Sequence, residues 1–142
     1  KTQVTERILE EVRGRMMEDI VLLETMKAAD KHHRVFKLQF AAGEFDMVIY
    51  DEKENNCEIF EIKHSGKQAP EQYRHLVDEE KCHQTERRFG PIRGRYVLYR
   101  GEVSQTEGGV QYRNVESYLK ELPDLDMCRS NKIAPQTIGP VL

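Results

Sequence analysis

The sequence predicts a single α/β domain in which a central mixed sheet is flanked by helices. Apolar residues recur at near-helical spacing over 5–28, whereas the segments within 35–64 alternate apolar and polar residues with period two. A polar helical segment and a further strand-like run come next, at about 70–89 and 95–100. The chain has 142 residues, a length that suits one domain with one hydrophobic core.

The first helix is predicted over residues 5–28, with Thr5 able to cap its start. Its near-helical spacing is carried by six apolar residues: Val4, Ile8, Val12, Met16, Ile20 and Leu23. Glu18 projects from the side opposite Met16 and Ile20. We therefore expect Glu18 to face whatever the rest of the domain places beneath the helix, although a solvated glutamate is the alternative.

Three strands are predicted next, at 35–40, 44–51 and 57–64, the last two forming a hairpin. In the first of them Phe36, Leu38 and Phe40 share one face. A polar helix is expected from Pro70, which suits a first helical turn, to about Phe89, where Gly90 and Pro91 follow.

The fourth strand is expected at 95–100, and Asn114 caps a short helix that runs to about Leu122. The element order is therefore α-β-β-β-α-β-α. We expect residues 1–122 to form the domain and residues 123–142 to be an extension that is docked on it or mobile.

The sequence argues against a membrane-spanning or secreted protein. A third of the residues are charged, and we expect a soluble cytoplasmic protein because no apolar run reaches membrane-spanning length and no signal peptide opens the chain. Three cysteines without metal-ligand spacing are expected to be reduced thiols. The chain starts at Lys1 rather than Met, so we expect it to be either processed or a piece of a longer protein.

The net charge of -3 provides no protein-wide attraction for nucleic acid, but the charge is unevenly distributed. Residues 1–62 hold 9 basic and 14 acidic groups, whereas residues 63–100 hold 9 basic and 5 acidic groups. The basic segment is what a phosphate-facing wall needs, and ordinary surface scatter is the alternative.

The hairpin predicts a patch of charged side chains on one face of the sheet. If Asp51 opposes Asn56, then Val48 opposes Ile59, Met47 opposes Phe60, Phe45 meets Ile62 and Asp46 opposes Glu61. In this register Phe45, Met47, Phe60 and Ile62 form one apolar face of the hairpin. Asp46, Glu61 and Lys63 share the reverse face. A slip of one residue separates the two carboxylates.

Two neighbouring carboxylates repel each other unless a proton or a cation lies between them. Mg²⁺ or Mn²⁺ prefers oxygen ligands and would satisfy both Asp46 and Glu61, and Lys63 could then orient a water or stabilise a phosphoryl oxygen. The alternative is a surface Glu–Lys pair on an exposed sheet face. Glu18 favours the metal site if its helix covers the patch.

Glu18, Asp46 and the run Glu61-Ile62-Lys63 resemble the active-site pattern of the PD-(D/E)XK nuclease superfamily, which has the restriction-endonuclease-like fold with an αβββαβ core. The resemblance covers about residues 10–100. The phrases 61–65, 70–73 and 94–101 are more particularly similar to the C-terminal domain of bacterial and archaeal AAA-type ATPases of poorly defined function.

The resemblance implies a role for each matching residue. Asp46, Glu61 and the carbonyl of Ile62 would be ligands of Mg²⁺ or Mn²⁺, Lys63 the catalytic lysine, and Glu18 the helix carboxylate that supports the metal or its water. Phe45 stands where the superfamily has its nominal proline. A Gln-x-x-x-Tyr pattern used by some branches is absent, because Gln72 and Tyr73 are adjacent.

The chain has no P-loop motif, so the resemblance implies a partner, the N-terminal ATPase domain of the parent chain. The other implied partner is nucleic acid, with DNA expected. Lys81, Arg87 and Arg88 on the polar helix are candidate phosphate contacts that no motif specifies. The residues leave three functions open: a metal-dependent nuclease, a DNA-binding or regulatory module with an idle site, and a protein-interaction domain of unknown oligomeric state.

Overall fold

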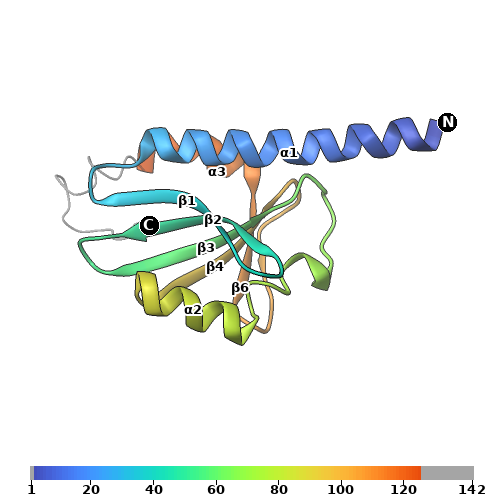
Figure 1. Ribbon diagram of the computed structural model, residues 1–142. Helices are drawn as coiled ribbons and strands as arrows, with labels where there is room; N and C mark the ends of the chain where they lie inside the picture. Colours follow the sequence, from blue (N-terminus) through green and yellow to red (C-terminus); the bar gives the residue numbers. More distant parts are fainter. Residues whose placement is uncertain (1, 126–142) are drawn as a thin grey trace.

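The computed structural model describes residues 2–125 as an α/β domain with three α-helices and a six-stranded mixed sheet (Figure 1). The helices are α1 (Thr2–Ala28), α2 (Glu79–Phe89) and α3 (Val115–Leu125), with a 3₁₀ turn, η1 (Pro70–Gln72), before α2. Helices α1 and α3 lie side by side on one face of the sheet, and α2 covers the other face (Figure 1). The domain therefore has three layers.

The sheet has the strand order β1-β2-β3-β4-β6-β5. Its strands are β1 (His33–Gln39), β2 (Glu44–Asp51), β3 (Asn56–Ile62), β4 (Ile92–Tyr99), β5 (Ser104–Gln105) and β6 (Val110–Asn114). Strands β1, β2 and β3 form an antiparallel meander, β4 runs parallel to β3, and β6 runs parallel to β4. The crossover from β3 to β4 contains α2, as a parallel connection requires.

Each face of the sheet supports its own apolar cluster, because side chains alternate along a strand. Under α1 and α3 the cluster contains Val21, Met47, Ile49, Phe60, Ile62, Tyr96, Leu98 and Tyr118. Under α2 it contains Leu38, Phe45, Val48, Ile59, Leu76, Val97, Tyr99 and Tyr112. The prediction that Phe36, Leu38 and Phe40 share a face is confirmed, since all three belong to the α2 side.

The predicted hairpin register is confirmed from the turn inward. Asp51 pairs with Asn56, Val48 with Ile59, and Met47 with Phe60, where the paired segment of β2 and β3 ends. The prediction that Phe45 and Ile62 share a face is wrong, because the two residues lie in opposite apolar clusters.

The physical reason is a β-bulge between β1 and β2. Phe36 pairs with Val48 but Leu38 pairs with Phe45, so Lys37 alone is opposite both Asp46 and Met47. The extra residue interrupts the alternation of side chains and turns Phe45 toward α2. Asp46 sits at the bulge.

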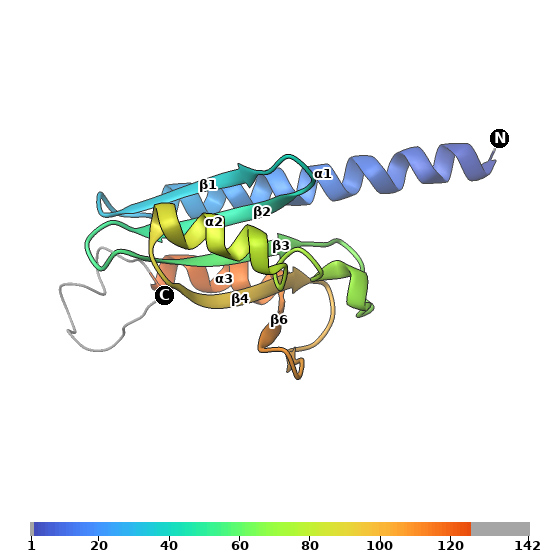
Figure 2. The same cartoon turned by 60° about the horizontal axis from the view of Figure 1, so that its bottom comes forward.

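Helix α1 buries a different stripe from the one that predicted it. Val21 and Thr25 are buried, and Met17, Leu22 and Ala28 pack against the same cluster. The regularly spaced apolar residues are exposed instead: Val4, Ile8, Val12, Met16, Ile20 and Leu23. The N-terminal half of α1 also extends past the sheet (Figure 2).

Helix α2 is shorter than predicted. It begins after Asp78, whose carboxylate accepts a hydrogen bond from the backbone N–H of Lys81 at 3.0 Å, and the segment from Pro70 onward is a 3₁₀ turn followed by further turns. The N-cap explains the late start, because Asp78 satisfies a free N–H group there. Phe89 is the last helical residue, as expected.

The last part of the fold was only partly predicted. Strands β5 and β6 lie between the fourth predicted strand and the Asn114 cap, and the sequence analysis does not predict them. Asn114 caps α3 as predicted, accepting a hydrogen bond from the N–H of Ser117 at 2.9 Å. Residues 123–125 continue α3, and the remainder of the predicted extension, residues 126–142, lies outside the described residues.

Within residues 2–125, no helix is both long enough and apolar enough to cross a membrane.

Cys57 and Cys82 are both buried free thiols. Burial raises the pKa of the Cys57 thiol to about 12, so this cysteine is not an activated nucleophile. Cys128 lies outside the described residues.

Candidate metal and phosphate site

The candidate site lies where β2 begins and β3 ends. Asp46 belongs to β2, Glu61 is the penultimate residue of β3, and Lys63 follows that strand directly. Asp46 is 5 % exposed and Glu61 is 3 % exposed, whereas Lys63 is partly exposed. Two carboxylates are thus buried at one end of the sheet beside an ammonium group that reaches solvent.

Asp46 is held in place by the backbone of the neighbouring strand. Its Oδ2 accepts a hydrogen bond of 2.8 Å from the N–H of Ile62, the residue after Glu61. The pKa of Asp46 is raised to about 6, because burial and the negative charge of Glu18 outweigh the lowering effect of this hydrogen bond. The convergence expected of Asp46 and Glu61 is therefore present, although the bulge and the Ile62 bond produce it rather than a direct cross-strand pair.

Glu61 is the least compensated group of the site. Its pKa is raised from 4.5 to about 8, because burial and the negative charge of Asp46 outweigh the lowering effects of Lys63 and of the backbone N–H of Asp46. Glu61 Oε1 lies 3.4 Å from Lys63 Nζ, but its Oε2 is buried without a hydrogen-bond partner. Burying a carboxylate oxygen without a partner is costly, so this atom fits a site that a proton or a cation completes.

The residues present fit a divalent cation. Asp46 and Glu61 offer hard oxygen ligands, and Mg²⁺ and Mn²⁺ prefer such ligands. Asp46 retains Oδ1, which no intramolecular bond of the described residues occupies, and Glu61 retains Oε2. Ile62 is the last residue of β3 and directs its N–H at Asp46 of β2, and its carbonyl stays a candidate ligand from the sequence pattern.

A second group of acids lies beside Asp46. Glu18 from α1, Glu44 from the start of β2 and Asp46 each place one carboxylate oxygen within 4.8 Å of the others. The expectation that Glu18 faces the sheet thus agrees with its position. Glu44 was missed by sequence reasoning, although its spacing of two residues from Asp46 is a same-face signal that could have identified it.

Lys37 was also missed, and it neutralises much of this acidic group. Its Nζ lies 3.5 Å from Glu18 Oε1 and 3.6 Å from Glu44 Oε2. Burial lowers the pKa of Lys37, but Glu44 and Glu18 outweigh that effect and raise the pKa above its usual value. Lys37 occupies the strand position opposite the bulge, so the same irregularity that positions Asp46 brings this lysine to it.

Three basic side chains lie close enough to His75 to affect its pKa. Burial lowers the pKa of His75, and the positive charges of Lys81, Arg74 and Lys63 lower it further. The ring of His75 lies against Gly43, where an added Cβ would come within 2.6 Å of it. Lys81 shares this group with Lys63 and also lies 3.5 Å from Asp78, between Nζ and Oδ2, so its contact with phosphate stays a prediction.

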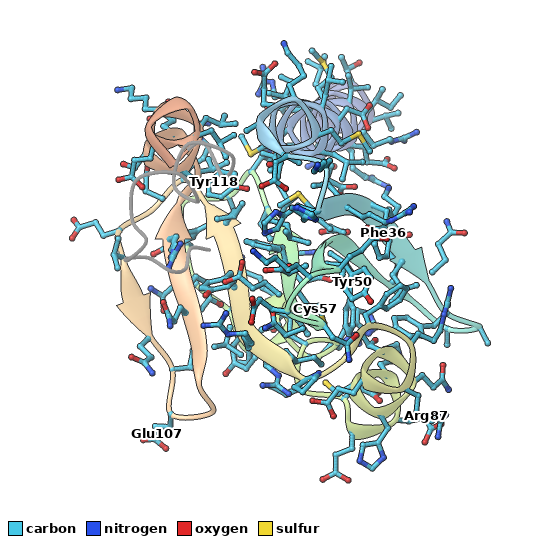
Figure 3. All side chains as sticks on the ribbon, turned by 90° about the vertical axis from the view of Figure 1, so that its left-hand side faces the viewer. Phe36, Tyr50, Cys57, Arg87, Glu107 and Tyr118 are labelled. Carbon is cyan, nitrogen blue, oxygen red and sulfur yellow. The ribbon has the colours of Figure 1, made fainter. Side chains whose placement is uncertain are left out.

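Arg87 and Arg88 lie away from the carboxylates. The Arg88 guanidinium is 4.8 Å from the centre of the Phe89 ring, which in turn contacts Tyr50 near the hairpin turn. Arg87 is exposed on the outer side of α2 (Figure 3). The structure does not bring these two arginines together with Asp46, Glu61 and Lys63.

Comparison of the chain with protein-family models, with curated proteins and with solved structures yields no match. The geometry of the site therefore carries the functional argument.

Proposed function

We propose that this chain is a metal-dependent nuclease-like domain that hydrolyses phosphodiester bonds. The observation that carries the proposal is the buried Glu61 Oε2 without a partner, placed beside a second buried carboxylate and a partly exposed lysine. A protein maintains such an uncompensated carboxylate at a cost to stability, and functional sites are where such costs are commonly found.

In this proposal Asp46 and Glu61 hold Mg²⁺ or Mn²⁺, together with the carbonyl of Ile62. The bound ion would neutralise phosphate charge and supply an activated water. The Ile62 N–H fixes Oδ2 of Asp46, so that Oδ1 would remain available to the ion. Lys63 would present a positive charge to a phosphoryl oxygen at the exposed edge of the site. Glu18 would support the ion or its water from the α1 side.

The arrangement of elements supports a restriction-endonuclease-like core. Helix α1, the meander β1-β2-β3, helix α2 and strand β4 follow one another in the αβββαβ order, and the carboxylates come from the second and third strands. With the sequence phrases described above, this supports a place as the C-terminal part of a larger cytoplasmic AAA-type ATPase, with that ATPase domain as a partner. Fold resemblance alone does not assign activity, so the site must be tested directly.

Nucleic acid is the proposed substrate, with DNA expected. Lys63 beside Glu61, with Arg74 and Lys81, whose charges act together with it on His75, provides the positive potential that attracts a phosphate backbone. Arg87 and Arg88 lie further along α2 and would contact a nucleic acid only outside the cleavage point.

A second candidate function is a binding or regulatory module with an idle acidic site. The observation that favours it is that Lys37 and Lys63 already compensate Glu18, Glu44 and one oxygen of Glu61. This alternative predicts salt-sensitive DNA binding that Arg87→Ala or Arg88→Ala weakens, with no cation binding at Asp46.

The test is cleavage of single-stranded, duplex and branched DNA, and of RNA, by the purified 142-residue chain with Mg²⁺ or Mn²⁺. We expect cleavage that Asp46→Asn and Lys63→Met each reduce at least about 100-fold, because each removes an interaction with the reacting groups. Lys53→Met, on the exposed hairpin turn, is the matched control. Absence of cleavage on every substrate, or cleavage that survives both active-site changes, contradicts the proposal.

A further inference from the structure

Lys37 is placed as an internal cation within the acidic site. It is the residue opposite the β-bulge, and its Nζ lies between Glu18 Oε1 at 3.5 Å and Glu44 Oε2 at 3.6 Å. Its side chain is only 34 % exposed, so the two ion pairs are partly shielded from water. Ion pairs in such a position are stronger than pairs on an open surface.

The carboxylates divide into an outer group and an inner pair. The outer group is Glu18, Glu44 and Asp46, whose three oxygens lie close enough to share one cation. The inner pair is Asp46 and Glu61, where Glu61 Oε2 is buried without a partner. Lys37 contacts the outer group alone, and Lys63 contacts Glu61 only through Oε1.

We propose that Lys37 fills the outer cation position, so that the site takes a single divalent ion, held by Asp46 and Glu61. This inference rests on the metal site of the proposed function. An ammonium group and a divalent ion cannot share the outer position, because the two positive charges would repel each other within a few ångströms. Removing the ammonium leaves three convergent carboxylates, which is a donor set that a hard divalent cation fits.

The test counts Mn²⁺ ions by isothermal titration and by the loss of the free-ion electron paramagnetic resonance signal. We expect one ion in the wild-type chain, two in Lys37→Met, and one in Lys37→Arg, which keeps the positive charge. Lys53→Met is the matched control and should bind one ion. Asp46→Asn should lose the ion in the wild-type background.

The outcomes separate the inference from the metal site on which it rests. One ion in both the wild-type chain and Lys37→Met overturns the role of Lys37 and leaves the metal site standing. Two ions in the wild-type chain also overturn the single-ion inference. No ion in the wild-type chain overturns both this inference and the metal part of the proposed function. Circular dichroism of each variant verifies that the count refers to folded protein.

A separate observation concerns α1. Eight large apolar side chains on this helix are each between 42 and 55 % exposed. They are Val4, Ile8, Leu9, Val12, Met16, Ile20, Leu23 and Met26. Most of them lie on the side opposite Val21 and Thr25, which face the sheet, and no described element covers that side (Figures 1 and 3). An apolar stripe of this size marks an interaction surface.

Five residues of the stripe have the seven-residue repeat of a two-stranded coiled coil, whose line of helix–helix contact is called the seam here. Leu9, Met16 and Leu23 are seven residues apart, with Val12 and Met26 between and after them at the complementary positions. The remaining position of the seam is Asp19. In a parallel pair of identical helices Asp19 would face its own copy, which is unfavourable, so the sequence favours the antiparallel arrangement.

We infer that two copies of this chain pair through α1 in antiparallel orientation. Leu9 then meets Met26 of the other copy, Val12 meets Leu23, and Glu6 comes level with Lys27 at both ends. The stripe faces away from each body, so the two domains do not collide. Eight half-exposed side chains from each helix give a total buried area on the order of 1,200 Å², which is the lower limit for a specific interface.

Analytical ultracentrifugation of the 142-residue chain tests this pairing. We expect a reversible dimer that Leu9→Lys with Leu23→Lys converts to a monomer, while the exposed Val103→Lys leaves it dimeric. In a Cys128→Ser background, oxidation should cross-link the double variant Val12→Cys, Leu23→Cys but not Val12→Cys alone. A monomer at every concentration overturns the inference, and cross-linking of the single variant overturns the antiparallel orientation.

Discussion

Glu58 and Glu61 of strand β3 are three residues apart, and the protein compensates their negative charges to different extents. The carboxylate of Glu58 accepts a hydrogen bond of 2.9 Å from the hydroxyl of Tyr96, and the Arg113 guanidinium lies 4.4 Å from the centre of that ring. Burial raises the pKa of Glu58, while Tyr96, Arg113 and Arg93 act against that rise. On the opposite face, Glu61 has Lys63 at 3.4 Å, the repelling Asp46 nearby and a buried oxygen without a partner.

Internal compensation of charge distinguishes the structural acid Glu58 from the candidate ligand Glu61. Both side chains lie in the same strand, and burial acts on both. The chain supplies Glu58 with a hydroxyl donor and positive charges, so its charge is met internally. Glu61 keeps one oxygen uncompensated, so its charge is met only by a proton or by a cation from outside.

The largest expected effect concerns cation affinity. Glu61→Gln removes a ligand charge from the inner pair, so the affinity for Mn²⁺ should fall by at least about 100-fold, equivalent to about 2.7 kcal/mol. Glu58→Gln is the matched control, because it changes the same residue type in the same strand. Titration calorimetry measures both variants. Equal losses for Glu58→Gln and Glu61→Gln would remove the distinction between the two acids.

The next effect concerns stability at the compensated acid. Tyr96→Phe removes the hydroxyl that donates to Glu58 and leaves a carboxylate oxygen without that donor. We expect a loss of about 1–3 kcal/mol in the free energy of unfolding, measured by urea titration. The double variant Tyr96→Phe, Glu58→Gln should lose less than the sum of the single changes, because the carboxylate charge is gone.

The stability of the metal-free chain should depend on pH because of Glu61. The pKa of Glu61 rises from 4.5 to about 8 on folding, so the folded chain binds more protons than the unfolded chain between these values. Stability contributed by the protonated carboxyl is therefore complete below about pH 4.5 and is lost as the pH rises to about 8. Without added metal, Glu61→Gln should remove this decline and be more stable than wild type near pH 8.

Thermal melts from pH 5 to pH 9, with a chelator and with Mn²⁺, measure this dependence. The cation should restore stability most at the higher pH, because it binds the ionised carboxylate. The same decline in wild type and in Glu61→Gln would show that another group, such as Asp46 with its pKa of about 6, carries the effect.

The smallest expected effect is at Arg113. Arg113→Met removes the cation that lies over the Tyr96 ring and that lowers the pKa of Glu58. Because Arg113 is exposed, we expect a loss of only about 0.5–1 kcal/mol, measured by urea titration. The loss should shrink when Glu58 is already Gln, and independence from Glu58 would mean that the arginine stabilises the ring rather than the acid.

Much of the fold was accessible from the sequence, for definable reasons. Strand β2 was predicted at 44–51 and lies there, because alternating apolar residues and a polar turn specify both the strand and its register. The Asn114 cap was predicted for a similarly local reason. Strands β5 and β6 were missed because they are short and form at the edge of the sheet, where their pairing depends on β4.

The candidate site was predicted in part. Asp46, Glu61, Lys63 and Glu18 came from spacing, and the structure places them at one end of the sheet. Lys37 was not selected because its role depends on the bulge, whereas the two-residue spacing of Glu44 from Asp46 was a local signal that went unused. Arg87 and Arg88 were predicted with Lys81 as basic residues of the polar helix, but the direction of α2 puts these two arginines toward the hairpin turn.

The amino-acid pattern was enough to specify the hairpin, its register and the presence of two acids and an amine near its open end, because period-two alternation is a local property of the chain. Three further features exist only in the folded chain: Asp46 turns at a bulge, Lys37 meets Glu18 across two elements, and one oxygen of Glu61 has no partner. Partners and burial arise from packing between distant segments, and no local pattern specifies them.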